Sequence, residues 1–168
     1  SYISNAVGFC GDRSLPAGIW GTNDNGDGVK NTQRASYFGA YGRHVKNVAQ
    51  FTCPEPSRDL YTTTDSSIGN KSLTYPVGLI TYDELIFAGM DNRHINKLSW
   101  AYSTEHYWTM SPSYFDVDWG SAIEWDLDST GHLIPWLDVT NMFGARPVIN
   151  LKSDTLITGG IGTSSDPF

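Results

Sequence analysis

Charge is scarce in this sequence, and basic charge most of all. Only 17% of the 168 residues are charged, and 18 Asp and Glu against 11 Lys and Arg give a net charge of −7. Binding to nucleic acid or to an anionic membrane surface relies on clustered basic residues. No apolar run reaches the roughly 20 residues of a transmembrane helix. The composition therefore predicts neither a nucleic-acid partner nor direct membrane insertion of this segment.

Motifs of known catalytic chemistry are also missing. The four histidines are scattered without HxH or HExxH spacing, and no GxSxG motif occurs. The only cysteines, Cys10 and Cys53, form no CxxC pair, which argues against a zinc site. We therefore expect a protein that is not an enzyme and that needs no cofactor.

The two cysteines are either bridged or two separate buried thiols. Low charge, with abundant Ser, Thr, Asn, Gly and Tyr, is typical of secreted or surface proteins, in which disulfides persist. We therefore predict a Cys10–Cys53 disulfide, which closes a long, Gly-rich loop and restricts the unfolded chain.

The length suits a single globular domain, residues 1–168. The chain up to about residue 72 is glycine-rich and irregular, which predicts long ordered loops. Thr81 and Glu84 then have capping-box spacing before a short helix expected over 82–88, and Gly89 ends it.

Short strands dominate the rest of the pattern. They are expected over residues 107–111, 121–128, 132–136 and 145–152. Pro135 indicates that its strand lies at a sheet edge or carries a bulge. One helix with several late antiparallel strands predicts an α+β domain.

Residues 100–119 are rich in aromatic side chains with small polar neighbours, a composition typical of recognition surfaces. Strand alternation places about half of these aromatics in the core. The ligand-binding residues predicted from this stretch are Trp100, Tyr102, Tyr114, Phe115, Asp116, Asp118 and Trp119. Trp and Tyr faces also stack on sugar rings, so a glycan is one expected ligand.

The strand expected over 121–128 alternates strictly, with Glu124, Asp126 and Asp128 on the face opposite its apolar residues. The ordinary interpretation is a solvated outer face. The alternative is a carboxylate pair of the kind that hydrolyses glycosides.

Residues 23–31, NDNGDGVKN, resemble the first half of a calcium loop. The predicted ligands are Asn23, Asn25 and Asp27, but the twelfth position holds Arg34, where such a loop needs an acid. The favoured interpretation is a polar turn that bonds its own backbone, with calcium as the alternative.

Several longer motifs carry a family resemblance. They are GFCGDRS (8–14), YFGAYGR (37–43), LTYPVGLITYDEL (73–85), YWTMSP (107–112) and the region from ARPVINLKSD to ITGGIGTSSDPF (145–168). Together they resemble a domain of unknown function in Gram-positive bacterial surface proteins, some adhesin-like and some prepilin-like. Their closing pattern is also distantly similar to the formylglycine-generating-enzyme and C-type-lectin-like fold.

This resemblance implies a C-type-lectin-like arrangement of short strands, one or two short helices and long ordered loops. It also implies that an N-terminal segment is missing before Ser1 and that residues 18–32 form an insertion. The function expected is a non-catalytic bacterial module, extracellular or at the cell surface. It would act in adhesion, ligand binding or assembly of a pilus-like structure. Its partners would be a glycan, a protein ligand or neighbouring subunits. The alternatives are a carbohydrate-active enzyme using the acidic strand face and a purely structural filament subunit.

Overall fold

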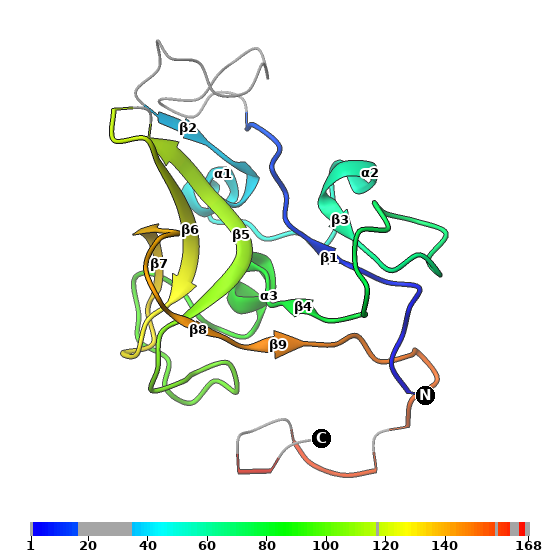
Figure 1. Cartoon of the computed structure of the whole chain (residues 1–168). Coiled ribbons are helices and arrows are strands. Elements are labelled where there is room, and N and C mark those ends of the chain that lie inside the picture. Colours follow the sequence, from blue (N-terminus) through cyan, green and yellow to red (C-terminus); the bar gives the residue numbers. More distant parts are fainter. Residues whose placement is uncertain (1, 17–34, 117, 157, 162–164, 167–168) are drawn as a thin grey trace.

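A curled antiparallel sheet of β5 (Tyr107–Asp116), β6 (Ser121–Leu127) and β7 (Leu133–Asp138) is the largest element of the computed structural model (Figure 1). The structure describes residues 2–16, 35–116, 118–156, 158–161 and 165–166. In sheet order β7 is an edge strand, and its pairing with β6 shifts between Glu124 and Asp126. The expectation of an edge or a bulge at Pro135 is therefore confirmed on both counts.

The remaining elements are short. In chain order they are β1 (Phe9–Cys10), β2 (Ala35–Tyr37), α1 (Gly39–Lys46), α2 (Pro56–Asp59), β3 (Leu60–Tyr61), β4 (Gly78–Leu79), α3 (Tyr82–Phe87), β8 (Gly144–Ala145) and β9 (Pro147–Val148). In the described part of the chain, three short helices beside a mostly antiparallel sheet confirm the α+β class.

The edge of β5 that faces away from β6 is covered by three separate short segments. The β8 strand pairs in parallel with the start of β5, and β2 pairs in antiparallel with its end. Between them, the Met110 amide donates to the Ile80 carbonyl oxygen at 2.8 Å. Segments from three parts of the chain thus converge on one strand and satisfy its backbone groups.

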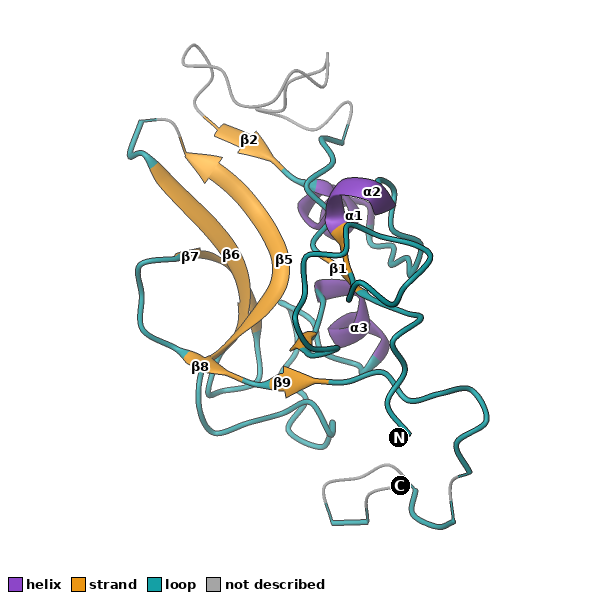
Figure 2. Ribbon diagram, turned by 45° about the vertical axis from the view of Figure 1, so that its right-hand side comes forward, coloured by secondary structure: helices purple, strands orange, loops and turns teal. Residues whose placement is uncertain are grey.

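The helices lie on one side of the main sheet, and the core fills the space between (Figure 2). Alternation along β6 places Trp125 and Leu127 in this core, where they meet Leu85 of α3. The α3 helix begins as predicted, because the Thr81 side chain accepts from the Glu84 amide and the Glu84 carboxylate accepts from the Thr81 amide. Gly89, at φ 81°, follows it in the left-handed conformation that suits a helix end.

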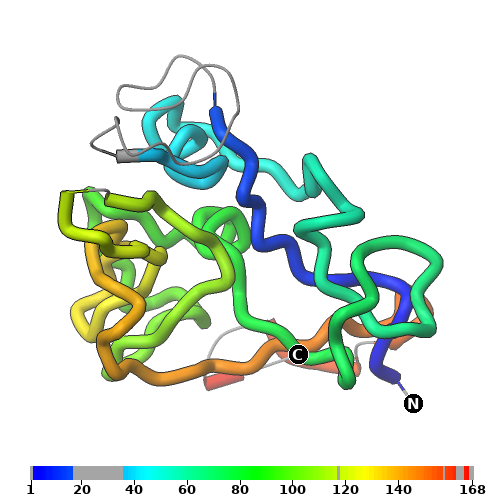
Figure 3. The backbone as a smooth tube through the Cα atoms, turned by 45° about the horizontal axis from the view of Figure 1, so that its top comes forward, coloured from blue at the N-terminus to red at the C-terminus, as the bar shows by residue number. Residues whose placement is uncertain are grey.

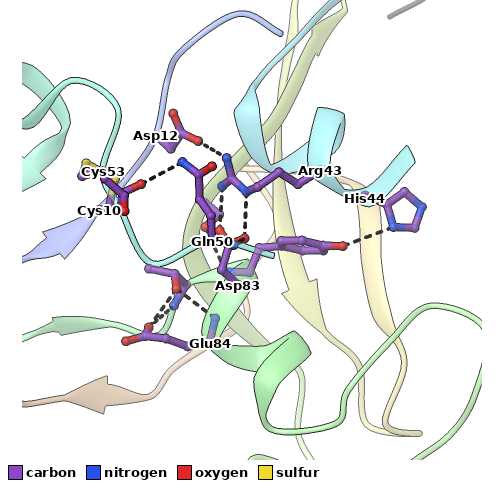
Figure 4. A network of polar contacts seen from close by, with 12 residues as sticks. Cys10, Asp12, Arg43, His44, Gln50, Cys53, Asp83 and Glu84 are labelled. Atoms are coloured by element: carbon purple, nitrogen blue, oxygen red, sulfur yellow. Dashed lines mark hydrogen bonds and ion pairs between the residues drawn. A yellow bond between two sulfur atoms is a disulfide. The ribbon is translucent and has the colours of Figure 1, made fainter. Parts of the chain in front are cut away.

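The α1 helix was not expected, because its sequence GAYGRHVK contains two glycines. Its tertiary contacts explain it. A Cβ atom at Gly39 would lie 2.1 Å from Asp12 Oδ2, so only glycine allows this close approach. Arg43 on α1 binds Asp12 and Asp83, both buried (Figure 4). The cations Arg43 and Lys46 in the last turn also interact favourably with the helix dipole.

The glycine-rich first part is held by covalent and ionic contacts. The predicted Cys10–Cys53 disulfide is present, with 5.6 Å between the Cα atoms. Asp59, which is fully buried, accepts hydrogen bonds from Arg13 and Arg58. These contacts fix long loops that have little secondary structure of their own.

The N-terminal segment lies beside the segment around Leu151 (Figure 3). Ile3 and Leu151 form an antiparallel bridge, flanked by hydrogen bonds from the Ser4 amide to the Asn150 oxygen and from the Lys152 amide to the Tyr2 oxygen. Among the helices of the described ranges, none is long and apolar enough to cross a membrane.

Candidate functional site

The predicted ligand-binding residues lie in two groups at opposite ends of β5. Trp100 and Tyr102 precede the strand, whereas Tyr114 to Trp119 lie at its far end and in the following turn. A strand of ten residues spans about 30 Å. The structure therefore does not bring the seven residues together on one continuous surface.

Most of the predicted residues at the far end of β5 and in the following turn contact other parts of the fold. Tyr114 packs against the tyrosine rings of β2 and α1, and Phe115 is half-buried. Asp116 Oδ1 accepts from the amides of Asp118 and Trp119, which closes the turn. Trp119 is 82% exposed at its tip.

Of the two predicted residues before β5, one is packed into the fold and the other is partly exposed. Tyr102 packs against the core, and its hydroxyl donates to the Ser129 carbonyl oxygen at 3.3 Å. Trp100 is 46% exposed and lines a groove of about 560 Å³. Of the seven predicted residues, it is therefore the one that takes part in this hollow.

Three exposed aromatic side chains, distant from one another in sequence, converge on this groove. Phe51 and Phe87 stack with ring centroids 4.2 Å apart, both are 64% exposed, and Trp100 shares the same hollow. Its lining is completed by Phe9, Ile80, Glu84, Ala88, Pro147, Val148, Ile149 and Asn150. We call this hollow the aromatic groove. Apolar side chains dominate it, with Glu84 and Asn150 as polar members.

Separate parts of the fold hold each aromatic residue of the groove. Phe87 ends α3, which turns Leu85 inward and leaves Phe87 at the surface. The Trp100 backbone is fixed because Arg146 donates to its carbonyl oxygen at 3.0 Å. Phe51 follows Gln50, whose amide donates to Asp83 Oδ1 at 3.0 Å. Hydrogen bonds thus hold the backbone at or next to Trp100 and Phe51.

A buried ionic network centred on Arg43 lies next to Gln50, the residue before Phe51 (Figure 4). Arg43 donates from Nε and Nη2 to the two carboxylate oxygens of Asp83, at 2.7 and 2.6 Å, and from Nη1 to Asp12. Two-point pairing of this kind fixes geometry as well as charge. Because all three groups are partnered, the network anchors α1 and the N-terminal segment to α3.

The acidic residues of β6 are not the solvated outer face that their alternation indicated. Asp126 is 0% exposed and Asp128 is buried, while Glu124 is half-buried. That expectation was therefore wrong, because His106 and Phe143 pack beside this part of the sheet. The His106 and Phe143 rings lie 4.7 Å apart, and His106 Nδ1 is 3.4 Å from Asp126 Oδ2.

The surroundings of these three carboxyl groups shift their pKa values in different directions. Burial raises the pKa of Glu124 to about 8. Burial, reinforced by the charge of Asp128, raises the pKa of Asp126 to about 7. Burial also disfavours the Asp128 carboxylate, but hydrogen bonds from His132, Thr130 and Gly131 outweigh it and lower the pKa of that residue. Neighbouring carboxyls with such different environments are a recognised sign of function.

No cluster of three or more His, Cys, Asp and Glu side chains suited to a metal ion occurs in the described part of the chain. The predicted calcium ligands Asn23, Asn25 and Asp27 lie outside the described residues. The calcium alternative therefore stays a prediction.

Comparison with known proteins yields no relative: no family model matches the chain, and no curated protein or solved structure is similar to it. The resemblance to Gram-positive surface domains and to the C-type-lectin-like fold thus stays a prediction. The candidate sites must be judged on their own geometry.

Proposed function

We propose that this chain is a non-catalytic extracellular or cell-surface binding module whose ligand occupies the aromatic groove. The observation that supports this most directly is the convergence of Phe51, Phe87 and Trp100 on one hollow. Monomeric proteins rarely leave several large aromatic rings together in solvent unless a ligand or partner covers them.

The chemistry of the groove favours a flat apolar ligand surface. Rigid aromatic rings offer a large contact area at a low cost in conformational entropy. They suit the apolar face of a sugar ring or an apolar side chain of a protein ligand. Among the lining residues Glu84 is the single carboxylate, and its Oε2 already accepts hydrogen bonds from the Thr81 amide and hydroxyl in the α3 capping box. This supports binding rather than catalysis in the groove.

The Cys10–Cys53 disulfide supports a location outside the reducing cytosol. The resemblance of the sequence to adhesin-like and prepilin-like chains suggests a bacterial surface and a role in adhesion or assembly there.

The test compares two tryptophans that differ in position. The wild-type protein, Trp100→Ala and Trp119→Ala are screened against a glycan array and a random peptide library. We expect Trp100→Ala to lose at least about tenfold in affinity, equivalent to about 1.4 kcal/mol. Trp119→Ala should bind as wild type, because it lies outside the groove.

If Trp119→Ala lost affinity and Trp100→Ala bound as wild type, the ligand would lie at the β5–β6 turn instead. No ligand in either library, together with self-association that Trp100→Ala abolishes, would replace this function with that of a structural subunit.

A further inference from the structure

The aromatic groove holds one charged side chain among its apolar and aromatic lining. Of the groove-lining residues that the structure describes, Glu84 is the only charged one, and Asn150 adds a side-chain amide. A carboxylate in an apolar hollow attracts a positively charged group more strongly than it would in open water, because the surrounding side chains screen it less. The charge of the groove is therefore complementary to a cation.

The Glu84 carboxylate has bonding capacity left for a ligand. Its Oε2 accepts hydrogen bonds from the Thr81 amide at 2.8 Å and the Thr81 hydroxyl at 2.9 Å (Figure 4). A carboxylate has roughly four acceptor sites. Within the described ranges, Glu84 Oε1 accepts no hydrogen bond, and no Lys or Arg forms an ion pair with this residue. The capping box thus holds the carboxylate in place and leaves its second oxygen open.

The basic residue next to the groove in the sequence is occupied elsewhere. Arg146 precedes the lining residue Pro147, but it does not itself line the groove. Its guanidinium donates to the carbonyl oxygens of Trp100 and Ala101, at 3.0 and 2.7 Å, and lies over the ring of the buried Tyr107. These contacts hold the Arg146 charge against the core, so it does not neutralise Glu84.

The aromatic rings favour the same kind of ligand as the carboxylate does. The face of an aromatic ring is negatively polarised and attracts a cation. Phe51 and Phe87 cover one face of each other, yet both residues stay 64% exposed, and Trp100 is 46% exposed. Several aromatic rings lining one hollow are the means by which proteins recognise organic cations.

We infer that the ligand of the aromatic groove is a small organic cation that carries a quaternary ammonium group. The inference rests on the proposed function and names the ligand class for that site. A primary ammonium is strongly hydrated and has three donors to satisfy, whereas Glu84 and Asn150 are the polar members of this lining. A quaternary ammonium has no donor, so its methyl groups can contact the rings while its charge lies near Glu84. The hollow of about 560 Å³ is of small-molecule size.

Charge complementarity also separates a free cation from a membrane lipid. The choline headgroup of a lipid carries a phosphate beside its quaternary ammonium. No Lys or Arg occurs among the described residues of the lining, so the phosphate would lie unpaired near a carboxylate. Leaving a charge without a partner is costly. The groove therefore suits a free cation better than a phospholipid surface.

The probe is choline, compared with its tert-butyl analogue, in which carbon replaces the charged nitrogen and the shape is kept. Binding is followed by NMR titration of the indole N–H signal of Trp100, which is assigned by its loss in Trp100→Phe. We expect choline to bind at least about tenfold more tightly than the analogue. Ethanolamine, which carries the primary ammonium, should bind more weakly than choline.

Two variants isolate the carboxylate. Glu84→Gln removes the charge, and glutamine also serves in a capping box, so the protein should stay folded by circular dichroism. This variant should bind choline and the tert-butyl analogue about equally, with its affinity for the analogue unchanged. Glu55→Gln removes an exposed carboxylate that makes no side-chain cap hydrogen bond and lies outside the groove lining. It should retain the preference of the wild type for choline.

The contradicting outcomes are distinct from one another. Equal affinity of the wild type for choline and the analogue, or a preference that survives in Glu84→Gln, would overturn the choice of a cation while leaving the groove as a binding site. Ethanolamine binding as tightly as choline would overturn the quaternary group. Phosphatidylcholine vesicles that bind as tightly as free choline would overturn the free ligand. If no probe shifts the Trp100 signal, the inference fails, whereas the proposed function is decided separately by the library screen with Trp100→Ala.

Discussion

Replacing Asp126 by Asn should change how the stability of the protein depends on pH. Asp126 is fully buried and both of its carboxylate oxygens lack a hydrogen bond. Its ionised form is therefore disfavoured in the folded protein, and its pKa rises to about 7 through burial and the charge of Asp128. In the unfolded chain the same group ionises near its ordinary value of about 4.

The sign follows from proton binding. Between about pH 4 and pH 7 the folded state holds a proton on Asp126 that the unfolded state has lost, so the free energy of unfolding falls as the pH rises. The stabilising contribution is complete below about pH 4 and is lost as the pH passes about 7. At about 1.4 kcal/mol for each pKa unit, the total is about 4 kcal/mol at most.

Urea denaturation of wild type and Asp126→Asn at pH 4, 6 and 8 measures this contribution. Relative to wild type, the variant should gain several kcal/mol in unfolding free energy between pH 4 and pH 8, since asparagine does not titrate. Asp154→Asn, at an exposed position, should follow the wild-type curve. A parallel pH dependence for wild type and Asp126→Asn would refute the conclusion that Asp126 is protonated in the folded state.

Three further variants test the framework, each by chemical denaturation. Arg43→Met removes the partner of two buried carboxylates and should destabilise the fold by about 3–5 kcal/mol. A loss of unfolding free energy below about 1 kcal/mol, on the order of an exposed ion pair, would contradict a buried network. Thr81→Ala breaks the capping box with Glu84 and should cost about 1 kcal/mol, whereas no change would show that α3 needs no cap. Replacing Cys10 and Cys53 together by serine opens a loop with a sequence separation of 43 and should cost about 4 kcal/mol; an unchanged midpoint under oxidising conditions would argue against the bond.

Features encoded within a few residues could be predicted from the sequence. The capping box at Thr81 and Glu84 places α3, because both partners belong to one helical turn. The alternation of apolar residues in β6 identifies the side that packs on the core. The edge position of β7 follows from Pro135, which has no amide hydrogen to donate.

Features that depend on distant segments could not be predicted in this way. Asp126 looks like a surface residue in the alternation of β6, and its burial depends on His106 and on Phe143 from outside that strand. The aromatic groove joins Phe51 and Phe87 across 36 positions that carry no shared motif. The sequence contained one local sign of the groove. Leu85 defines the inward face of the α3 helix, so Phe87 at the end of that helix lies off this face, at the surface.

The pairing of the segments around Ile3 and Leu151 has a mechanical consequence. Because the segments around Ile3 and Leu151 run antiparallel, the chain continues from the same end of the pair in both directions. Tension applied through the two ends therefore loads these hydrogen bonds one after another, as in unzipping, rather than all at once. Separation would proceed to Asn150 and Ile149, which form part of the groove wall. A pulling force would thus separate one side of the aromatic groove from the rest of its wall, so the ligand binding proposed for the groove should weaken under tension.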